Sequence, residues 1–224
     1  MDRTESSPGK IVRVMDEAGI DRSVVFAMCE TTRAATERAV AAMAEFPDRL
    51  IGFAYAIAGF DTNVLEDLAA AIDQGCRGIK LHAGETSLRQ WVVDPLFAFA
   101  AERNVPILVD SKGDFAAIER LAATFPDAKI ICAHLGNMGE AATRRIIDMA
   151  KDTENLYLDT SWVRMTHYIA RAIHTSGAAK VLFGSDGPDV NVKVELFKIK
   201  VLDLPGEDEQ LVLGGNILRL IGEA

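Results

Sequence analysis

The fold is decided by Lys129-Ile130-Ile131-Cys132-Ala133-His134, a nearly continuous apolar run that ends in an ionisable residue. Pro106-Ile107-Leu108-Val109-Asp110 and Gly78-Ile79-Lys80-Leu81-His82 follow the same plan. Strands that are apolar on both faces are typical of parallel sheets covered by helices. The three runs therefore predict a parallel sheet whose strands end in polar residues.

Similar β-rich runs alternate with helical patterns along the whole chain. The expected strands are Ser23–Met28, Leu50–Ala56, Gly78–His82, Pro106–Asp110, Lys129–His134, Leu156–Asp159 and Val181–Gly184. Between them, apolar residues recur at helical spacing, as at Ile118, Leu121 and Ala122. Regular strand–helix alternation predicts parallel strands joined by right-handed crossovers. We expect one α/β domain over residues 1–224, a (β/α) TIM-type barrel with seven recognisable strands.

The first strand of such a barrel has no counterpart in this sequence. Residues 8–18 read as a helix that stops at Gly19, and nothing ahead of that helix reads as a strand. Either the barrel has seven strands or it is open where another should be. An open strand edge invites association, so we expect a homo-oligomer.

The composition narrows the class of protein. Of the 224 residues, 49% are hydrophobic and 25% charged, which is typical of a globular protein with a sizeable core. The formal net charge of −9 argues against nucleic-acid or anionic-membrane partners, because binding phosphates requires a basic face. We expect the partner to be a small-molecule substrate.

Cellular location and cysteine use follow from local patterns. The start, residues 1–9, is polar, and no apolar run approaches the roughly 20 residues of a membrane span, so we expect a cytoplasmic protein. Cys29, Cys76 and Cys132 have neither zinc-motif nor redox-motif spacing. They are expected to be small buried hydrophobic residues in a reducing compartment.

Ionisable residues gather where the expected strands end. They are Lys80, His82, Asp110, His134, Asp159 and Asp186. The carboxyl ends of parallel strands meet at one edge of an α/β barrel, which is where its active sites occur. The side chains of five strands would therefore converge on one mouth.

Asp186 and His134 are the expected catalytic residues. Asp186 lies in Gly184-Ser185-Asp186-Gly187-Pro188, where it could ligate a metal or take a proton from water; the alternative is a loop carboxylate that caps the next helix. His134 could be a ligand, an acid/base or a substrate donor; the alternative is a histidine bonded to a neighbouring carbonyl.

Two further segments carry candidates for substrate and metal binding. Lys80 and His82 share one face of their strand and would be costly to bury without partners, for which Asp110 or Asp186 could serve. They form either a binding site or a structural ion pair, since both uses bury charges. Asp110 could be an oxygen ligand for a divalent metal or a turn residue, and Lys112 beside it is a candidate substrate contact.

Other polar motifs read as structural. His167 and His174 lie on the expected helix Arg164–Ser176 with no acidic ligand beside them, so we expect surface or packing roles. Gly214-Gly215-Asn216 reads as a helix start and not as a phosphate loop, because no strand leads into it.

The ordered set of motifs resembles the amidohydrolase-related, TIM-barrel family of metal-dependent hydrolases, which includes decarboxylases and lactonases. The resembling segments are Met15-Asp16-Glu17-Ala18-Gly19-Ile20-Asp21, Gly78-Ile79-Lys80-Leu81-His82, Val105-Pro106-Ile107-Leu108-Val109, Ala133-His134-Leu135-Gly136, Phe183-Gly184-Ser185-Asp186 and Gly214-Gly215-Asn216-Ile217. Each segment is weak evidence alone, and together they cover nearly the whole chain.

The resemblance implies a metal site that is only half present. His134 and Asp186 match the family's later ligands, whereas its first-strand His-x-His pair has no counterpart and Asp110 stands where it has a fifth-strand histidine. Asp110, His134 and Asp186 could supply three ligands, and such an oxygen-rich set suits Mg or Mn better than Zn.

Three hypotheses follow. The first is a hydrolase or decarboxylase for a small acid, with Asp186 as base or ligand, His134 as acid/base, and Lys80 with His82 holding the substrate carboxylate. The second is a catalytically silent barrel that binds a ligand or a partner subunit. The third is an upstream coding stretch carrying the missing ligands, which reading the gene ahead of Met1 would reveal.

Overall fold

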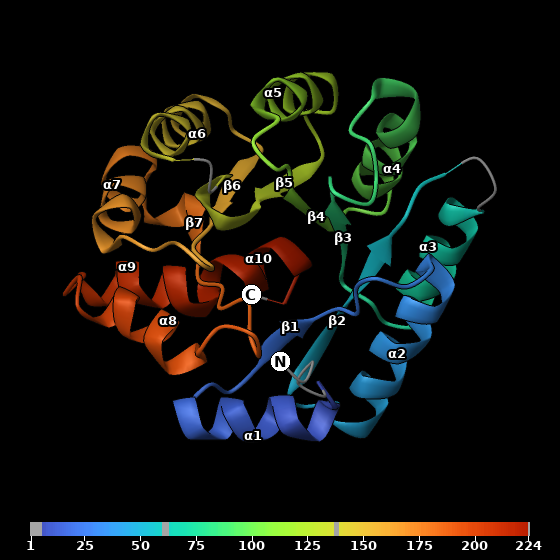
Figure 1. Ribbon diagram of the computed structural model, residues 1–224, viewed down its shortest axis with the longest axis horizontal. Coiled ribbons are helices and arrows are strands. Elements are labelled where there is room, and N and C mark those ends of the chain that lie inside the picture. The colour runs from blue at the N-terminus through green and yellow to red at the C-terminus, as the bar shows by residue number, and fades with distance from the viewer. Residues whose placement is uncertain (1–5, 60–62, 137–138, 224) are drawn as a thin grey trace.

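A single sheet of seven parallel strands forms the centre of the computed structural model, which describes residues 6–59, 63–136 and 139–223. The strands follow one another in the sheet in chain order. They are β1 (Ser23–Val25), β2 (Leu50–Ala56), β3 (Gly78–His82), β4 (Pro106–Asp110), β5 (Lys129–Cys132), β6 (Leu156–Asp159) and β7 (Val181–Leu182). The sheet curls with helices around its outside, which confirms the predicted TIM-type barrel (Figure 1).

In the described part of the chain, six helices connect consecutive strands and cover the outer face of the sheet, one helix precedes β1 and three follow β7 (Figure 1). They are α1 (Pro8–Ala18), α2 (Thr32–Glu45), α3 (Val64–Asp73), α4 (Gln90–Glu102), α5 (Phe115–Thr124), α6 (Glu140–Asp152), α7 (Thr166–Ser176), α8 (Val192–Lys200), α9 (Gly206–Gln210) and α10 (Asn216–Ile221). Short helical turns occur at Ala133–Gly136, Ala178–Lys180 and Leu211–Gly215. Among the described residues, every helix is too short or too polar to cross a membrane.

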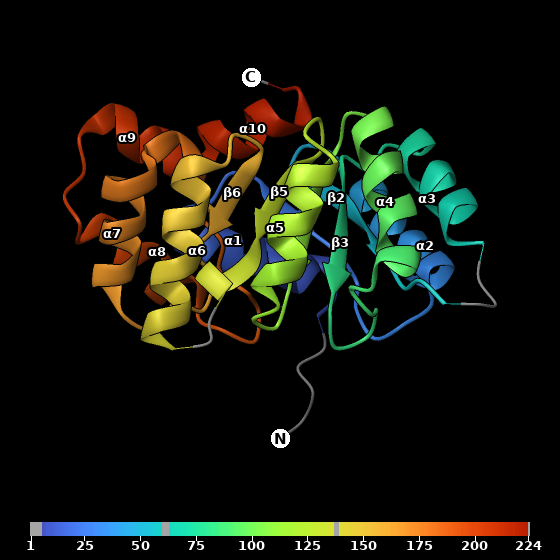
Figure 2. The same ribbon diagram turned by 90° about the horizontal axis from the view of Figure 1, so that it is seen from above.

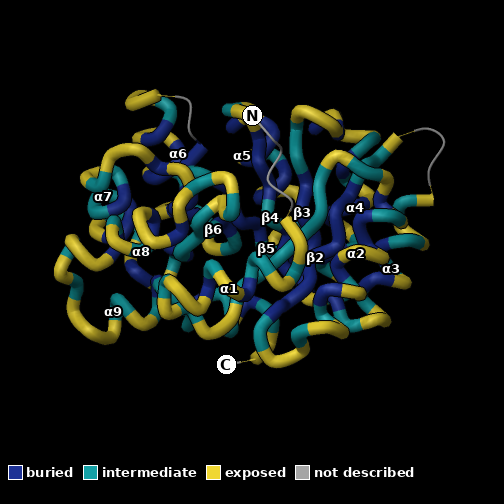
Figure 3. Tube along the Cα trace, turned by 60° about the horizontal axis from the view of Figure 1, so that its bottom comes forward, coloured by how far each residue is buried: buried dark blue, intermediate teal, exposed yellow. Residues whose placement is uncertain are grey.

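The main core lies between the sheet and the outer helices. Side chains alternate along each strand, so Ile79 and Leu81 of β3 and Ile107 and Val109 of β4 point outward into this core and are fully buried. The strands form the buried interior in Figure 3, while the exposed segments lie on the helices and loops. The remaining residues of each strand face the concave side, where the site lies.

The C-terminal helix α10 covers part of the concave side. Leu220 packs with Ile131 of β5 and Leu182 of β7. Lys129, the first residue of β5, donates from Nζ to the carbonyl oxygen of Leu220 at 2.8 Å. Helix α10 therefore lies at the amino ends of the strands, opposite the strand tips (Figure 2). It fills one end of the barrel and leaves the carboxyl ends of the strands for the site.

The sheet stays open between its first and last strands. Its order runs from β1 to β7 without a pairing between these two among the described residues. Instead, α1 packs against α8, and Glu17 pairs with Lys193 at 3.2 Å. The ring of helices is thus continuous where the ring of strands is not.

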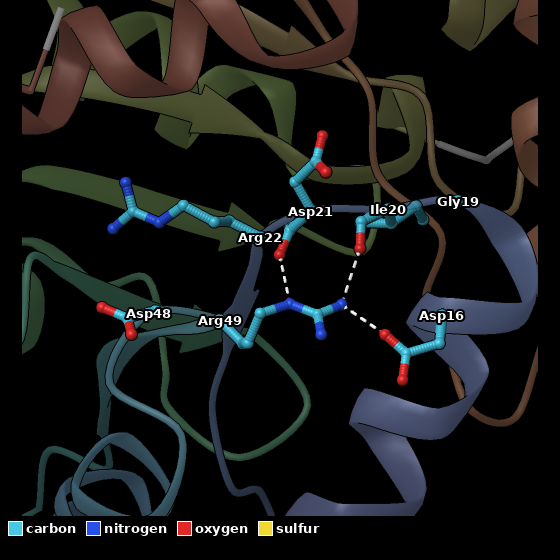
Figure 4. Close-up of a pocket in the computed structure, with 7 residues that line it drawn as sticks. All are labelled: Asp16, Gly19, Ile20, Asp21, Arg22, Asp48 and Arg49. Atoms are coloured by element: carbon cyan, nitrogen blue, oxygen red, sulfur yellow. Dashed lines mark hydrogen bonds and ion pairs between the residues drawn. The ribbon is translucent and has the colours of Figure 1, made fainter.

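Arg49 fixes α1 to the start of the sheet. Its guanidinium donates to the carbonyl oxygens of Asp21 at 2.6 Å and Ile20 at 3.0 Å, and to Oδ1 of Asp16 at 2.7 Å (Figure 4). These groups line a shallow hollow of about 570 Å³. Arg49 immediately precedes β2, so the hollow lies at the amino ends of the strands, away from the ionisable cluster.

Three predicted strands are longer than the observed ones. The prediction Lys129–His134 was wrong at its end, because the chain turns at His134 and Leu135, whose φ angles of 60° and 45° are left-handed. The predicted strands Ser23–Met28 and Val181–Gly184 end at Val25 and Leu182. The prediction that Cys29 is buried was also wrong: it lies exposed on the turn after β1, whereas Cys76 and Cys132 are buried.

Candidate active site

The carboxylate of Asp110, at the end of β4, lies at the centre of the cluster. Its Oδ2 lies 2.9 Å from Nζ of Lys112, 3.4 Å from Nε2 of His82 and 3.6 Å from Nε2 of His134. Burial alone would raise the pKa of this carboxyl, but the hydrogen bonds from the side chain and backbone of Lys112 and the charge of His134 hold it below its usual value. Asp110 is therefore an anion with the side-chain nitrogen atoms of three residues close to its Oδ2.

The backbone sets which ring nitrogen of His82 carries the proton. The backbone N–H of Gly84 donates to Nδ1 of His82 at 3.2 Å, so Nδ1 acts as an acceptor and Nε2 carries hydrogen. The Nε2–H then points toward Asp110. Burial lowers the pKa of His82, and the charge of Asp110 opposes this only in part. A neutral His82 that donates to Asp110 is consistent with both observations.

His134 has the opposite arrangement. Its Nδ1 lies 3.0 Å from the backbone carbonyl oxygen of Ser161 and 2.8 Å from Oγ of Ser161. Since a carbonyl oxygen can only accept, Nδ1 carries the hydrogen. In the neutral ring, Nε2 therefore keeps its lone pair and faces Oδ2 of Asp110. His134 is positioned to accept a proton, or to hold one, at Nε2.

Asp159 and Ser161 support this orientation from β6. Oδ1 of Asp159 accepts from the backbone N–H of His134 at 3.1 Å and of Ser161 at 3.2 Å, and also from Oγ of Ser161. The carboxylate leans over Gly184, where a Cβ would lie 1.9 Å from Oδ2 of Asp159. A side chain at that position would displace the Asp159 carboxylate from His134 and Ser161, which accounts for Gly184 just after β7.

Lys80 points into the same cluster but forms no close ion pair. It is 3% exposed, and its Nζ lies 5.3 Å from the ring centroid of Phe26. Within the described residues, no carboxylate lies within ion-pair distance of this Nζ and no hydrogen bond to it is formed. Burial lowers the pKa of Lys80, and the charges of Asp110, Asp159 and Asp186 raise it only in part. The predicted partners therefore act on Lys80 through space.

Asp186 lies at the end of β7 in a left-handed backbone conformation with φ 53° and is exposed. None of the ion pairs among the described residues includes it, although its charge reaches Lys80. Its carboxylate is therefore less tightly placed than those of Asp110 and Asp159. The catalytic role of Asp186 stays a prediction.

The predicted metal ligands come together only in part. Asp110 and His134 face each other, and a catalytic zinc site needs about three protein ligands. In the described part of the chain, no three His, Cys, Asp or Glu side chains are arranged to hold a metal. The ammonium of Lys112 also occupies Oδ2 of Asp110, where a cation would bind. The side chains as arranged do not fit a catalytic metal.

Three residues of the cluster had no assigned role in the sequence. Ser161 lies in the turn two residues after Asp159, the last residue of β6, so strand alternation did not reach it. Tyr55 is paired with Lys80 in the register of β2 and β3, and its hydroxyl donates to Oε2 of Glu85 at 2.6 Å. Burial, with this hydrogen bond, raises the pKa of Tyr55. No sequence pattern pointed to Glu85, because it lies in the turn after β3.

The motifs expected to be structural lie away from the cluster. His167 and His174 are exposed on α7, which confirms the surface reading. The prediction of a helix start at Gly214-Gly215-Asn216 was wrong, because these residues continue a helical stretch that begins with α9 at Gly206 and runs through the π-helical turn Leu211–Gly215 into α10. Asn216 is completely buried, and its Nδ2 donates to the carbonyl oxygens of Ala178 at 2.7 Å and Val181 at 2.8 Å.

A comparison with known families decides the chain's relationship. The sequence model of the Amidohydro_2 family, described as amidohydrolase, matches residues 1–222. The chain belongs to this family. The resemblance seen in the sequence motifs is therefore confirmed over nearly the whole length of this amidohydrolase-family protein.

Solved structures show the same fold. An uncharacterised TIM-barrel protein from Bordetella bronchiseptica matches with TM-score 0.80 and 20% identity, over 95% of this chain and 82% of that one. The 5-carboxyvanillate decarboxylase of Sphingomonas paucimobilis matches with TM-score 0.78 and 14% identity, over 96% and 82%. A dihydroxybenzoic acid decarboxylase from Polaromonas, solved with manganese and 2-nitroresorcinol, matches with TM-score 0.70 and 20% identity, over 99% and 86%. No curated protein matches the sequence.

Proposed function

We propose that this amidohydrolase-family protein is a hydrolase or decarboxylase that acts on a small carboxylate-bearing substrate. The observation that carries the proposal is the arrangement around Asp110. There, Lys112 and His82 supply positive charge or donors, and Nε2 of His134 is free to exchange a proton. The named activities of the two decarboxylases with the same fold, which act on aromatic acids, support a carboxylate substrate.

Each residue has a role in this proposal. Lys80, His82 and Lys112 hold the substrate carboxylate, because a cation or N–H donor binds a carboxylate oxygen directly. In hydrolysis, His134 takes a proton from the attacking water at Nε2. In decarboxylation, the bond to the carboxylate carbon breaks, CO₂ leaves, and His134 gives a proton to the remaining carbon. Asp186, on the open side of the cluster, assists as a second base.

Turnover on a panel of substrates tests the proposal. Lactones, hydroxybenzoic acids and 2-oxo acids would be assayed with the wild-type protein and with Asp186→Asn, which removes the charge while keeping the shape. We expect turnover of at least one substrate class. In the variant this turnover should fall at least tenfold, because a base that accepts a proton in the reaction is lost. Asp189→Asn, in the same loop, is the matched control. Full activity in Asp186→Asn would remove Asp186 from the mechanism, and no turnover at all would favour the silent barrel.

Metal content is expected to be low. With only Asp110 and His134 facing each other and Lys112 on the same oxygen, we expect purified protein to hold well below one equivalent of Zn, Mg or Mn after dialysis. Elemental analysis by mass spectrometry measures this directly. One equivalent that survives dialysis and disappears in Asp110→Asn would instead establish Asp110, His134 and Asp186 as the predicted metal site.

A further inference from the structure

Lys80 is the one buried lysine of the cluster that has no ion-pair or hydrogen-bond partner among the described residues. Its neighbour Lys112 reaches Asp110 at 2.9 Å, whereas Lys80 Nζ has only the ring face of Phe26 close to it. Lys80 lies on the concave face of β3, in register with Tyr55 of β2 and Leu108 of β4. Its amine is therefore held by its strand on the same side of the sheet as Asp110 and His134.

A buried ammonium without a close carboxylate is costly, and the cost falls when the group gives up its proton. Burial lowers the pKa of Lys80, the charges of Asp110, Asp159 and Asp186 oppose this only in part, and the positive charge of Lys112 acts in the same direction as burial. A lysine that is desolvated and lies near another cation is the arrangement that turns an amine into a nucleophile. An uncharged amine still donates N–H to a substrate carboxylate, as the proposed function requires, and it also has a lone pair that can attack a carbonyl carbon.

We propose that Lys80 is a covalent nucleophile whose amine forms an imine with the ketone of a 3-oxo acid, as the first step of its decarboxylation. This inference rests on the proposed function, since it uses the same site and names a substrate class for it. Lys112, half exposed and beside Asp110, is placed to bind the carboxylate end of such an acid.

The chemistry balances without any further reactant. The neutral amine attacks the ketone carbon, and loss of water with uptake of one proton gives the iminium ion. The bond to the carboxylate carbon then breaks, CO₂ leaves, and its electron pair moves into the enamine. A proton from the site, for which Nε2 of His134 is the candidate donor, returns to carbon. Water then hydrolyses the iminium ion and releases the ketone and the amine of Lys80.

Reductive trapping tests the proposal on the full-length protein. The protein would be incubated with acetoacetate and sodium cyanoborohydride, and the modified lysine located by peptide mass spectrometry. We expect an isopropyl group on Lys80, since the imine is reduced after CO₂ has left. The adduct should disappear in Lys80→Arg and persist in Lys151→Arg, which changes an exposed lysine of α6. A parallel incubation with acetone, the product of acetoacetate decarboxylation, measures how much label arises when free product reacts with lysines directly.

Other outcomes have distinct meanings. No adduct on Lys80, or equal labelling of Lys80 and exposed lysines, would overturn the imine. If no adduct forms but the protein turns over aromatic acids or lactones, which have no ketone to trap, the proposed function holds and only the imine is excluded. Lys80→Met checks folding, because replacing a buried amine that has no partner by an apolar side chain removes the cost of burying a polar group. A raised melting temperature would support the unpaired amine, and marked destabilisation would contradict it.

Discussion

Replacing His134 with glutamine is expected to lower kcat/KM about 10²- to 10⁴-fold on whichever acid the protein turns over. The physical reason is the position of Nε2. Because the carbonyl oxygen of Ser161 requires hydrogen on Nδ1, the ring can exchange a proton only at Nε2, which faces Asp110. A glutamine side chain has similar polarity but cannot exchange a proton near neutral pH. Steady-state kinetics on the best substrate of the panel measures the loss.

Matched controls separate chemistry from folding in this experiment. His167→Gln and His174→Gln make the same change at exposed positions of α7 and are expected to leave kcat/KM unchanged. The melting temperature of His134→Gln should be recorded beside these controls. Wild-type kcat/KM in folded His134→Gln would show that the proton is handled elsewhere.

Replacing Asn216 with alanine is expected to produce the largest loss of stability. Asn216 is fully buried, and its amide donates to two carbonyl oxygens, those of Ala178 and Val181. Leaving a buried acceptor without its partner costs about 1–3 kcal/mol, so two such losses cost roughly 2–6 kcal/mol. These bonds join α10 to the start of β7, so their loss also loosens the helix that fills the amino end of the barrel.

Chemical denaturation measures this change as a shift in the free energy of unfolding. Asn63→Ala is the matched control, because Asn63 is exposed and its side chain bonds only to the nearby Glu66 among the described contacts. Its effect should stay within about 0.5 kcal/mol, the usual range for surface substitutions. An equal effect of both variants would show that the buried amide contributes no more than a surface one.

The order of the strands could be predicted because their apolar runs are distinct and regularly spaced. The ends of the strands could not. At His134 the chain turns left-handed one residue after an apolar stretch, since the hydrogen bond from its backbone N–H to Asp159 holds it there. Asp159 is distant in sequence, so no local pattern contains this bond. Cys29 illustrates the same limit, because the turn that exposes it follows an early end of β1.

The candidate site could likewise be predicted only in part. Alternation placed Lys80 and His82 on one face, and the strand-end rule brought Asp110 and His134 to the same mouth. The roles within the mouth depended on contacts between strands. The two histidines have opposite tautomers because one meets the N–H of Gly84 and the other the carbonyl of Ser161. The sequence left open whether Lys80 serves binding or forms an ion pair, and in the structure it lies over Phe26 without a close carboxylate among the described residues.

The sequence by itself determined the family, the parallel barrel and the cluster of ionisable residues, because each of these depends on the order and period of residue types along the chain. The tertiary structure alone decided that α10 fills the amino end, that β1 and β7 do not pair within the described residues, and which ring nitrogen of His82 and of His134 carries the hydrogen. Those features depend on distances between residues far apart in the chain. Burial and proton positions follow from such distances, and a sequence pattern does not contain them.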